Sequence, residues 1–372
     1  MGRYSVETVF EGMKTYYYIQ DTETLEIAEI PSRYLMHKHR TNKSPNTVRE
    51  DAYAVCFYLG YLSDIGMKLM DVYDLPFEQQ NEHFVKFLYW LKAGNHRENH
   101  KDYIIRNGTC NAYLKAVFRF YLFMENQEEM VNGLKVLSYD HTTRYNAVGI
   151  KKKLRFHSFK GYLKTEERNV RPAEHDEIIT ILQACTNCRD QLLLLMIAET
   201  GFRIGEILGV DYSRDIDYNR HLVQVYFRAE NENGARAKNA EYRKAKISQD
   251  TFEFLLYYLA EYRELIQHEK FLFVNISGKN AGQPLKVESV YAMLKRMEKK
   301  TSIKLTPHML RRYFANMRRK SGWRLELIQQ ALGHKHLDTT IKYLNIMDDE
   351  LLQASQEFYE KYSAIYNVGQ LL

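Results

Sequence analysis

The chain has 372 residues, which is too long for one small module and fits two ordinary domains. Hydrophobic residues make up 45% and charged residues 27%, as in soluble globular proteins, and no apolar run is long enough to span a membrane. Four cysteines do not make a disulfide framework, and the first residues lack the apolar core of a signal peptide. We therefore expect a cytoplasmic protein, with Cys185 and Cys188 as reduced thiols rather than a zinc site.

The positive charge is concentrated in one short stretch. Lys and Arg number 53 against 47 Asp and Glu, a net charge of +6. Residues 151–171 contain eight basic and two acidic side chains, so this stretch accounts for the whole excess. Such a stretch fits a connector that contacts DNA, and equally a solvated loop.

The first part of the chain reads as a mixed segment followed by a helical domain. Residues 1–43 suggest strand or irregular structure, which we interpret as an N-terminal arm. Ser44 can cap a helix that Pro45 opens. Apolar residues at helical spacing predict helices to about residue 62, over 77–93 and from Thr109 onward. We expect one small helical domain over 44–150.

A basic linker over 151–172 leads into a second domain over 173–372. Helical periodicity dominates this domain, and one pair of alternating strands interrupts it. The predicted helices lie at about 175–184, 190–199, 206–210, 251–266, 287–299, 307–320, 324–331, 338–344 and 348–364, and the strands at 222–227 and 245–247. The sequence therefore predicts a mainly α (α+β) protein with one small antiparallel sheet.

Four local patterns in the second domain are candidates for chemistry. In two of them, Arg203 begins a helix just after a glycine, and Pro307 opens a helix that places His308 and Arg311 on one face. Each pattern alone is common on protein surfaces, so only their combination is informative. The four patterns are Thr200-Gly201-Phe202-Arg203, His308-Met309-Leu310-Arg311, Leu332-Gly333-His334, and Tyr343 nine residues after His334.

Together these side chains could surround one phosphodiester. Arg203 and Arg311 can each present a planar donor fork to the non-bridging oxygens, where charge develops on a pentacoordinate phosphorus. Tyr343 can attack phosphorus and form a covalent phosphotyrosyl bond. A phenol with a pKa of about 10 needs activation at neutral pH, which an imidazole or the arginine pair can supply.

In these motifs the chain resembles the tyrosine recombinase (phage integrase) family, from about Ser44 to the C-terminus. The family pattern T-G-x-R-x-x-E matches Thr200 to Glu206, H-x-x-R matches His308 to Arg311, and L-G-H followed by a tyrosine matches Leu332 to Tyr343. The resemblance implies a helical core-binding domain that clamps DNA and a mostly helical catalytic domain.

The resemblance also implies a set of site residues. The family uses a lysine on a β-hairpin, here 223–247, for which we predict Lys238, with Lys244 and Lys246 as alternatives. No metal and no cofactor are expected. The predicted catalytic residues are Arg203, Lys238, His308, Arg311, His334 and Tyr343, and the predicted DNA contacts are Lys115, Arg119, Lys151, Lys152, Lys153, Lys160 and Lys164.

The implied activity is site-specific recombination of double-stranded DNA through a 3′-phosphotyrosyl intermediate and a Holliday junction. A homo-tetramer joined by exchange of the C-terminal helix is expected, and a transposon or conjugative element is the first expectation for its origin. Two other interpretations stay open: a type IB topoisomerase-like enzyme that relaxes DNA, and an inactive DNA-binding accessory protein.

Overall fold

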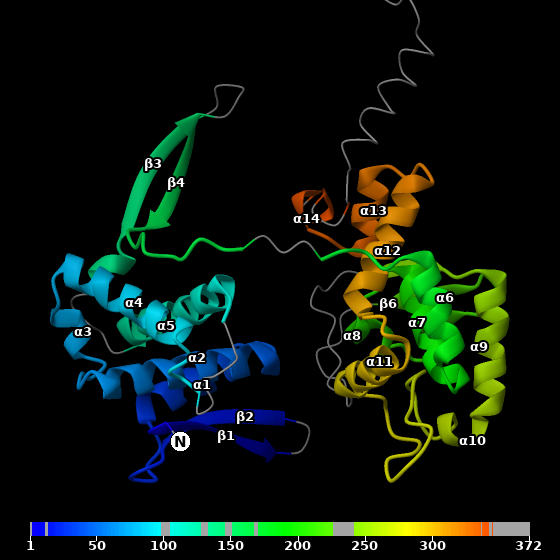
Figure 1. Cartoon of the computed structure of the whole chain (residues 1–372), viewed down its shortest axis with the longest axis horizontal. Helices are drawn as coiled ribbons and strands as arrows, with labels where there is room; N and C mark the ends of the chain where they lie inside the picture. The colour runs from blue at the N-terminus through cyan, green and yellow to red at the C-terminus, as the bar shows by residue number, and fades with distance from the viewer. Residues whose placement is uncertain are drawn as a thin grey trace, which may run out of the picture. The chain divides into compact units, whose positions relative to one another are not determined.

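The computed structural model describes residues 2–11, 14–97, 105–127, 133–145, 151–166, 170–225, 242–335, 337–341 and 344. These residues divide into two compact units, Met1–Arg168 and Asn169–Leu372 (Figure 1). Within the described residues, no helix is long and apolar enough to cross a membrane.

A helical core of aliphatic and aromatic side chains dominates the first unit. Helix α2 begins as predicted, because the Ser44 side chain accepts a hydrogen bond from the Thr47 amide at 3.2 Å and Pro45 occupies the first turn. Helix α5 packs against both α2 and α4 (Figure 1). The helices of this unit are α1 (Glu29–Arg40), α2 (Pro45–Asp64), α3 (Asp71–Asp74), α4 (Phe77–Lys92) and α5 (Asn107–Gln127), followed by a 3₁₀ turn at Lys135–Leu137.

The first 40 residues are part of this unit, which corrects the expectation of a separate arm. Strands β1 (Tyr4–Glu11) and β2 (Lys14–Asp21) form an antiparallel hairpin, and α1 follows it. Ile19, Tyr34 and Leu35 are buried in the same core as the later helices. Helix α1 escapes detection in the sequence because Pro31 lies in its first turn, where a missing amide donor is tolerated, and because its last turn is strongly basic.

The basic stretch begins as a strand, so the prediction of a linker over 151–172 needs correction. Strand β4 (Lys151–His157) pairs antiparallel with β3 (Tyr139–Tyr145), from Tyr139 opposite His157 to Tyr145 opposite Lys151. Three consecutive lysines show no alternation of polar and apolar residues, and this conceals the strand in the sequence.

The residues after β4 are fixed to α5. The Asn111 side chain donates to the Leu163 carbonyl at 2.7 Å and accepts from the Leu163 amide at 3.0 Å. The Glu166 carboxylate accepts from the Asn107 amide at the start of α5, and Phe159 is buried against the helices. Residues 158–166 therefore belong to the first unit rather than to a linker.

The second unit is mostly helical with one small sheet, as predicted. Strand β6 lies between β5 and β7, and the β6–β7 pairing runs from Leu222 opposite Lys246 to Val225 opposite Arg243. Helix α12 packs against α7 and α13 (Figure 1). The elements are α6 (His175–Ala184), α7 (Cys188–Thr200), α8 (Ile204–Ile207), β5 (Ile216–Asp217), β6 (Leu222–Val225), β7 (Arg243–Lys246), α9 (Gln249–Glu261), α10 (Arg263–Ile266), α11 (Val287–Thr301), α12 (Pro307–Lys320), α13 (Leu325–Leu332) and α14 (Leu337–Ile341).

Candidate active site

A glycine in the left-handed conformation creates the first part of the site. Helix α7 ends at Thr200, and Gly201 caps it with φ of 65°. A Cβ atom at this position would lie 2.4 Å from the ring of Phe314, so both the backbone conformation and the space require glycine. The turn brings Arg203 to the start of α8.

A buried carboxylate holds Arg203. Glu206 is 3% exposed, and it accepts from the Arg203 amide at 2.7 Å and from the Arg203 guanidinium at 3.0 Å. It also forms an ion pair with Arg243 of β7. Burial alone would raise the pKa of Glu206, but the charge of Arg243 and the hydrogen bond and charge of Arg203 outweigh it and lower the pKa. Glu206 is therefore ionised at neutral pH and fixes the orientation of Arg203.

Arg311 connects the first part of the site to the L-G-H segment. It lies in the first half of α12 and is 2% exposed. One terminal nitrogen donates to the Gly201 carbonyl, and the other donates to the Leu332 carbonyl and lies 3.1 Å from Nε2 of His334. Arg311 and His334 thus share one hydrogen-bond network, anchored at Gly201, two residues before Arg203.

His334 is held in a defined tautomer. It follows Gly333, which caps α13 with φ of 61°. Because a guanidinium can only donate, Nε2 of His334 accepts from Arg311 and Nδ1 carries the proton toward the Thr340 hydroxyl at 3.0 Å. Burial, followed by the charges of Arg311, Arg203 and Arg243, lowers its pKa to about 3. His334 is therefore neutral at physiological pH.

His308 lies on the same helix as Arg311, one turn earlier. Thr306 caps this helix by accepting from the Met309 amide at 3.2 Å, and Pro307 opens it, both as predicted. The His308 side chain is exposed, although partial loss of solvent around the ring and the charges of Arg312, Arg311 and Arg203 lower its pKa. It is the more accessible of the two imidazoles.

Two predicted catalytic residues, Lys238 and Tyr343, lie outside the described residues, as does the tail helix expected over 348–364. Lys244 and Lys246, the alternatives to Lys238, are exposed on β7. Among the described residues, no group of three or more His, Cys, Asp or Glu side chains could hold a metal ion.

The sequence prediction missed Arg243. It looked like one more surface cation in a basic hairpin, yet only 6% of its side chain is exposed. The alternation of buried Arg243, partly buried Ala245 and buried Ile247 with exposed Lys244 and Lys246 was the available signal.

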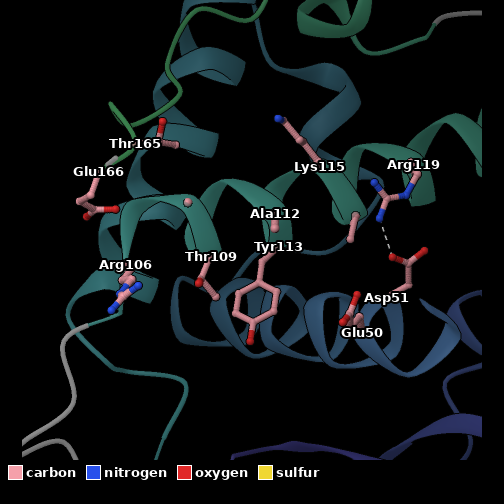
Figure 2. Close-up of a pocket in the computed structure, with 12 residues that line it drawn as sticks. Glu50, Asp51, Arg106, Thr109, Ala112, Tyr113, Lys115, Arg119, Thr165 and Glu166 are labelled. Carbon is pink, nitrogen blue, oxygen red and sulfur yellow. Dashed lines mark hydrogen bonds and ion pairs between the residues drawn. The ribbon is translucent and has the colours of Figure 1, made fainter. Parts of the chain in front are cut away.

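Of the predicted DNA contacts, Lys115 and Arg119 line a groove of about 660 Å³ on the first unit (Figure 2). Arg119 donates to Asp51 at 2.6 Å, and the Asp51 carboxylate also binds Lys38 at 2.7 Å and the Tyr34 hydroxyl at 2.9 Å. Lys160 and Lys164 are exposed on the segment fixed to α5. Lys151, Lys152 and Lys153 lie on β4.

Comparison with known proteins identifies the family. The sequence pattern of the phage integrase family matches residues 168–350, which include all four motifs. The chain carries the domain of the phage integrase family, the tyrosine recombinases.

Two curated relatives and one solved structure illustrate this membership. Transposase A from transposon Tn554 of Staphylococcus aureus is 25% identical over 363 residues, which cover 93% of this recombinase and 94% of that protein. The tyrosine recombinase XerA of Saccharolobus solfataricus is 30% identical over 191 residues, which cover 50% of this chain and 56% of that protein. The Tn1549 transposon integrase in complex with transposon right end DNA covers 88% of this chain and 98% of that chain, with a TM-score of 0.58 and 14% identity. This last likeness confirms the expected tyrosine recombinase fold.

Proposed function

We propose that this recombinase performs site-specific strand exchange on double-stranded DNA by forming a 3′-phosphotyrosyl bond with Tyr343. The observation that carries the proposal is the clustering of three predicted residues. Arg311 bonds His334 and the Gly201 carbonyl, and Glu206 holds Arg203 close enough for its charge to lower the pKa of His334. Two arginines and a neutral imidazole, held by buried protein groups, form a preorganised site for a phosphodiester anion.

Each residue has a defined chemical task in this mechanism. The guanidinium groups of Arg203 and Arg311 stabilise the charge on the non-bridging oxygens while the Tyr343 oxygen bonds to phosphorus and the bond to the 5′ oxygen breaks. The leaving 5′ oxygen takes a proton from Lys238. A second 5′ hydroxyl then attacks the phosphotyrosyl bond, which restores the phosphodiester and the phenol without an external energy source.

The two histidines differ in the task that suits them. His334 engages Arg311 through Nε2, and its pKa of about 3 makes it a weak base, so it orients the arginine. His308 is exposed at the helix start and neutral at physiological pH, which suits it to accept the phenol proton. A phosphate anion bound beside both rings would raise both pKa values and strengthen them as proton acceptors.

The basic side chains of the first unit bind the DNA phosphates. The Asp51 carboxylate holds Arg119 in place, so that its exposed part is presented to solvent with little loss of side-chain entropy on binding a phosphate. Lys115, Lys160, Lys164 and the three lysines of β4 add phosphate contacts that are independent of DNA sequence.

The biological setting is that of a mobile element. The match to a transposon-encoded transposase over 93% of the chain favours a transposase over a chromosomal resolvase. The active assembly is a homo-tetramer in the cytoplasm, bound to paired DNA sites and joined through the C-terminal helix.

The test is a suicide substrate, a DNA duplex carrying the recombination site with a nick next to the scissile phosphate. The wild type should form a covalent protein–DNA complex, and Tyr343→Phe should form none. A covalent complex with Tyr343→Phe would overturn the assignment, and no complex with the wild type would indicate an accessory protein. Relaxation of supercoiled DNA by monomers, without recombinant product, would indicate the topoisomerase-like activity.

A further inference from the structure

Arg243 is a buried arginine at the centre of the site that no step of the mechanism uses. It is the first residue of β7, and only 6% of its side chain is exposed. Its guanidinium pairs with Glu206, donates to the Ala331 carbonyl at 3.0 Å and lies 5.3 Å from the centre of the Phe202 ring. A Cβ atom at Gly333 would lie 2.7 Å from its Nε atom.

These contacts fix the guanidinium on every side. The Ala331 carbonyl at the end of α13 accepts from the guanidinium, and the Phe202 ring packs against the guanidinium. Only glycine at position 333 leaves room for this side chain. Arg243 is therefore a rigid group, although it comes from an exposed basic strand.

Because Glu206 contacts both arginines, the fixed position of Arg243 also restricts Arg203. The same carboxylate oxygen, Oε1, accepts from Arg203 and pairs with Arg243. Without Arg243, a carboxylate this deeply buried would take up a proton or draw Arg203 inward to replace the missing charge. Either change would move Arg203, whose side chain is 26% exposed, from the position it holds in this network.

We propose that Arg243 is a positioning residue for strand cleavage, which acts through Glu206 on Arg203 and does not itself contact DNA. The inference rests on the proposed function of Arg203 as a ligand of the scissile phosphate. It also assigns the β6–β7 hairpin a task besides carrying the lysine, because the first residue of β7 controls the orientation of an arginine on α8.

The first experiment is a double-mutant cycle for covalent complex formation at saturating protein. Arg243→Gln should slow cleavage by about 100-fold, as expected when a donor to developing charge is misplaced, and leave the Kd for DNA within about twofold. The double variant Arg203→Ala with Arg243→Gln should be no slower than Arg203→Ala alone, because Arg243 acts through Arg203. Arg220→Gln, the same substitution at an exposed arginine that precedes β6 in the same sheet, is the matched control and should cleave as the wild type does.

A second substrate separates positioning from folding. A methylphosphonate at the scissile position removes the negative charge that Arg203 neutralises, so the defects of Arg203→Ala and Arg243→Gln should shrink together on it. A loss of folded protein would reduce cleavage of both substrates equally. Arg243→Lys keeps the charge beside Glu206 and should recover part of the rate, and it serves for the same comparison if Arg243→Gln does not fold.

Three results would overturn the inference: cleavage by Arg243→Gln within about threefold of the wild type, defects that multiply in the double variant, or an equal defect on both substrates. If Arg203→Ala itself cleaves normally, the proposed function of Arg203 fails instead, and the two failures are thus distinguishable.

Discussion

The two units contain the same device, a buried carboxylate that connects an enclosed cation to a more exposed arginine. In the first unit Asp51 binds Lys38 and Arg119, and in the second Glu206 binds Arg243 and Arg203. Both carboxylates are almost fully buried, at 1% and 3% exposure. In both cases the cation pair replaces the water that the carboxylate loses on folding.

The two units differ in how exposed the more accessible arginine of each pair is, Arg119 in the first unit and Arg203 in the second. The Arg119 side chain is 47% exposed, whereas that of Arg203 is 26% exposed. Asp51 also accepts from the Tyr34 hydroxyl, while Glu206 accepts from the Arg203 backbone itself, which ties this arginine at two points. An arginine held through its guanidinium alone suits a phosphate contact at the surface, and one held also through its backbone suits a reaction that requires one geometry. The following predictions test this distinction, from the largest expected effect to the smallest.

Arg203→Ala should lower the rate of covalent complex formation on a suicide substrate by about 10²–10³-fold, because the site then lacks one donor to the developing charge. Arg220→Ala, an exposed arginine of the same unit, is the control. A rate for Arg203→Ala close to that of the control would mean that the ion pairs of Glu206 with Arg203 and Arg243 contribute to folding and not to cleavage.

Asp51→Ala should lower the free energy of unfolding of the first unit by about 3 kcal/mol, because Lys38 and Arg119 are deprived of their shared partner while Lys38 stays buried. Denaturant unfolding followed by circular dichroism measures the change. Glu50→Ala replaces the exposed neighbour and should be nearly neutral. Equal unfolding curves for the two variants would mean that the Asp51 ion pairs do not stabilise the first unit.

Replacing Lys151, Lys152 and Lys153 together with Gln should weaken DNA binding and reduce the slope of log K against log salt by about 0.9 for each phosphate that is no longer neutralised. Cleavage at saturating protein should persist, because these lysines lie on β4 of the first unit. A slope equal to that of the wild type would mean that β4 is solvated in the complex.

His334 should make the stability of the second unit depend on pH. Its pKa falls from 6.5 to about 3 on folding, so between these values the unfolded chain binds more protons. Stability should therefore decline as pH falls from about 6.5, by about 2 kcal/mol between pH 7 and pH 5. His334→Gln should lack this part of the decline, and parallel pH curves for the two proteins would contradict the lowered pKa.

Arg119→Gln should give the smallest effect, a reduction of the salt slope by about 0.9 with unchanged cleavage at saturating protein. Lys86→Gln is the control, since Lys86 pairs with Glu82 on α4 and does not line the groove of Figure 2. A cleavage defect in Arg119→Gln at saturating DNA would show that the outer arginine of the first unit also takes part in chemistry.

Local signals made much of the fold predictable. Ser44 with Pro45, and Thr306 with Pro307, predict the starts of α2 and α12 because capping and proline geometry act within one turn. Helix α1 and the β3–β4 hairpin were missed for the opposite reason. Pro31 imitates a helix breaker, and β4 gains its structure from residues on β3 rather than from its own pattern.

The same distinction holds for the site. Arg203, His308, Arg311 and His334 sit in short motifs. The structure joins Arg311 and His334 by a hydrogen bond and places the charge of Arg203 close enough to affect His334. Arg243 and Asp51 were missed because their roles depend on partners far along the chain, such as Arg119, 68 positions from Asp51. Lys238 and Tyr343 remain predictions.

Residues 158–166, the segment fixed to α5, determine which N-terminal fragments of the protein can fold. Phe159 packs edge-on against Phe84 and Phe118, and Glu166 supplies the acceptor for the first amide of α5. A fragment ending before Ser158 would lack both and expose an aromatic pocket to water. A fragment ending just after Glu166 would retain them together with Lys160 and Lys164, and this is the shortest N-terminal piece from which independent folding and DNA binding are expected.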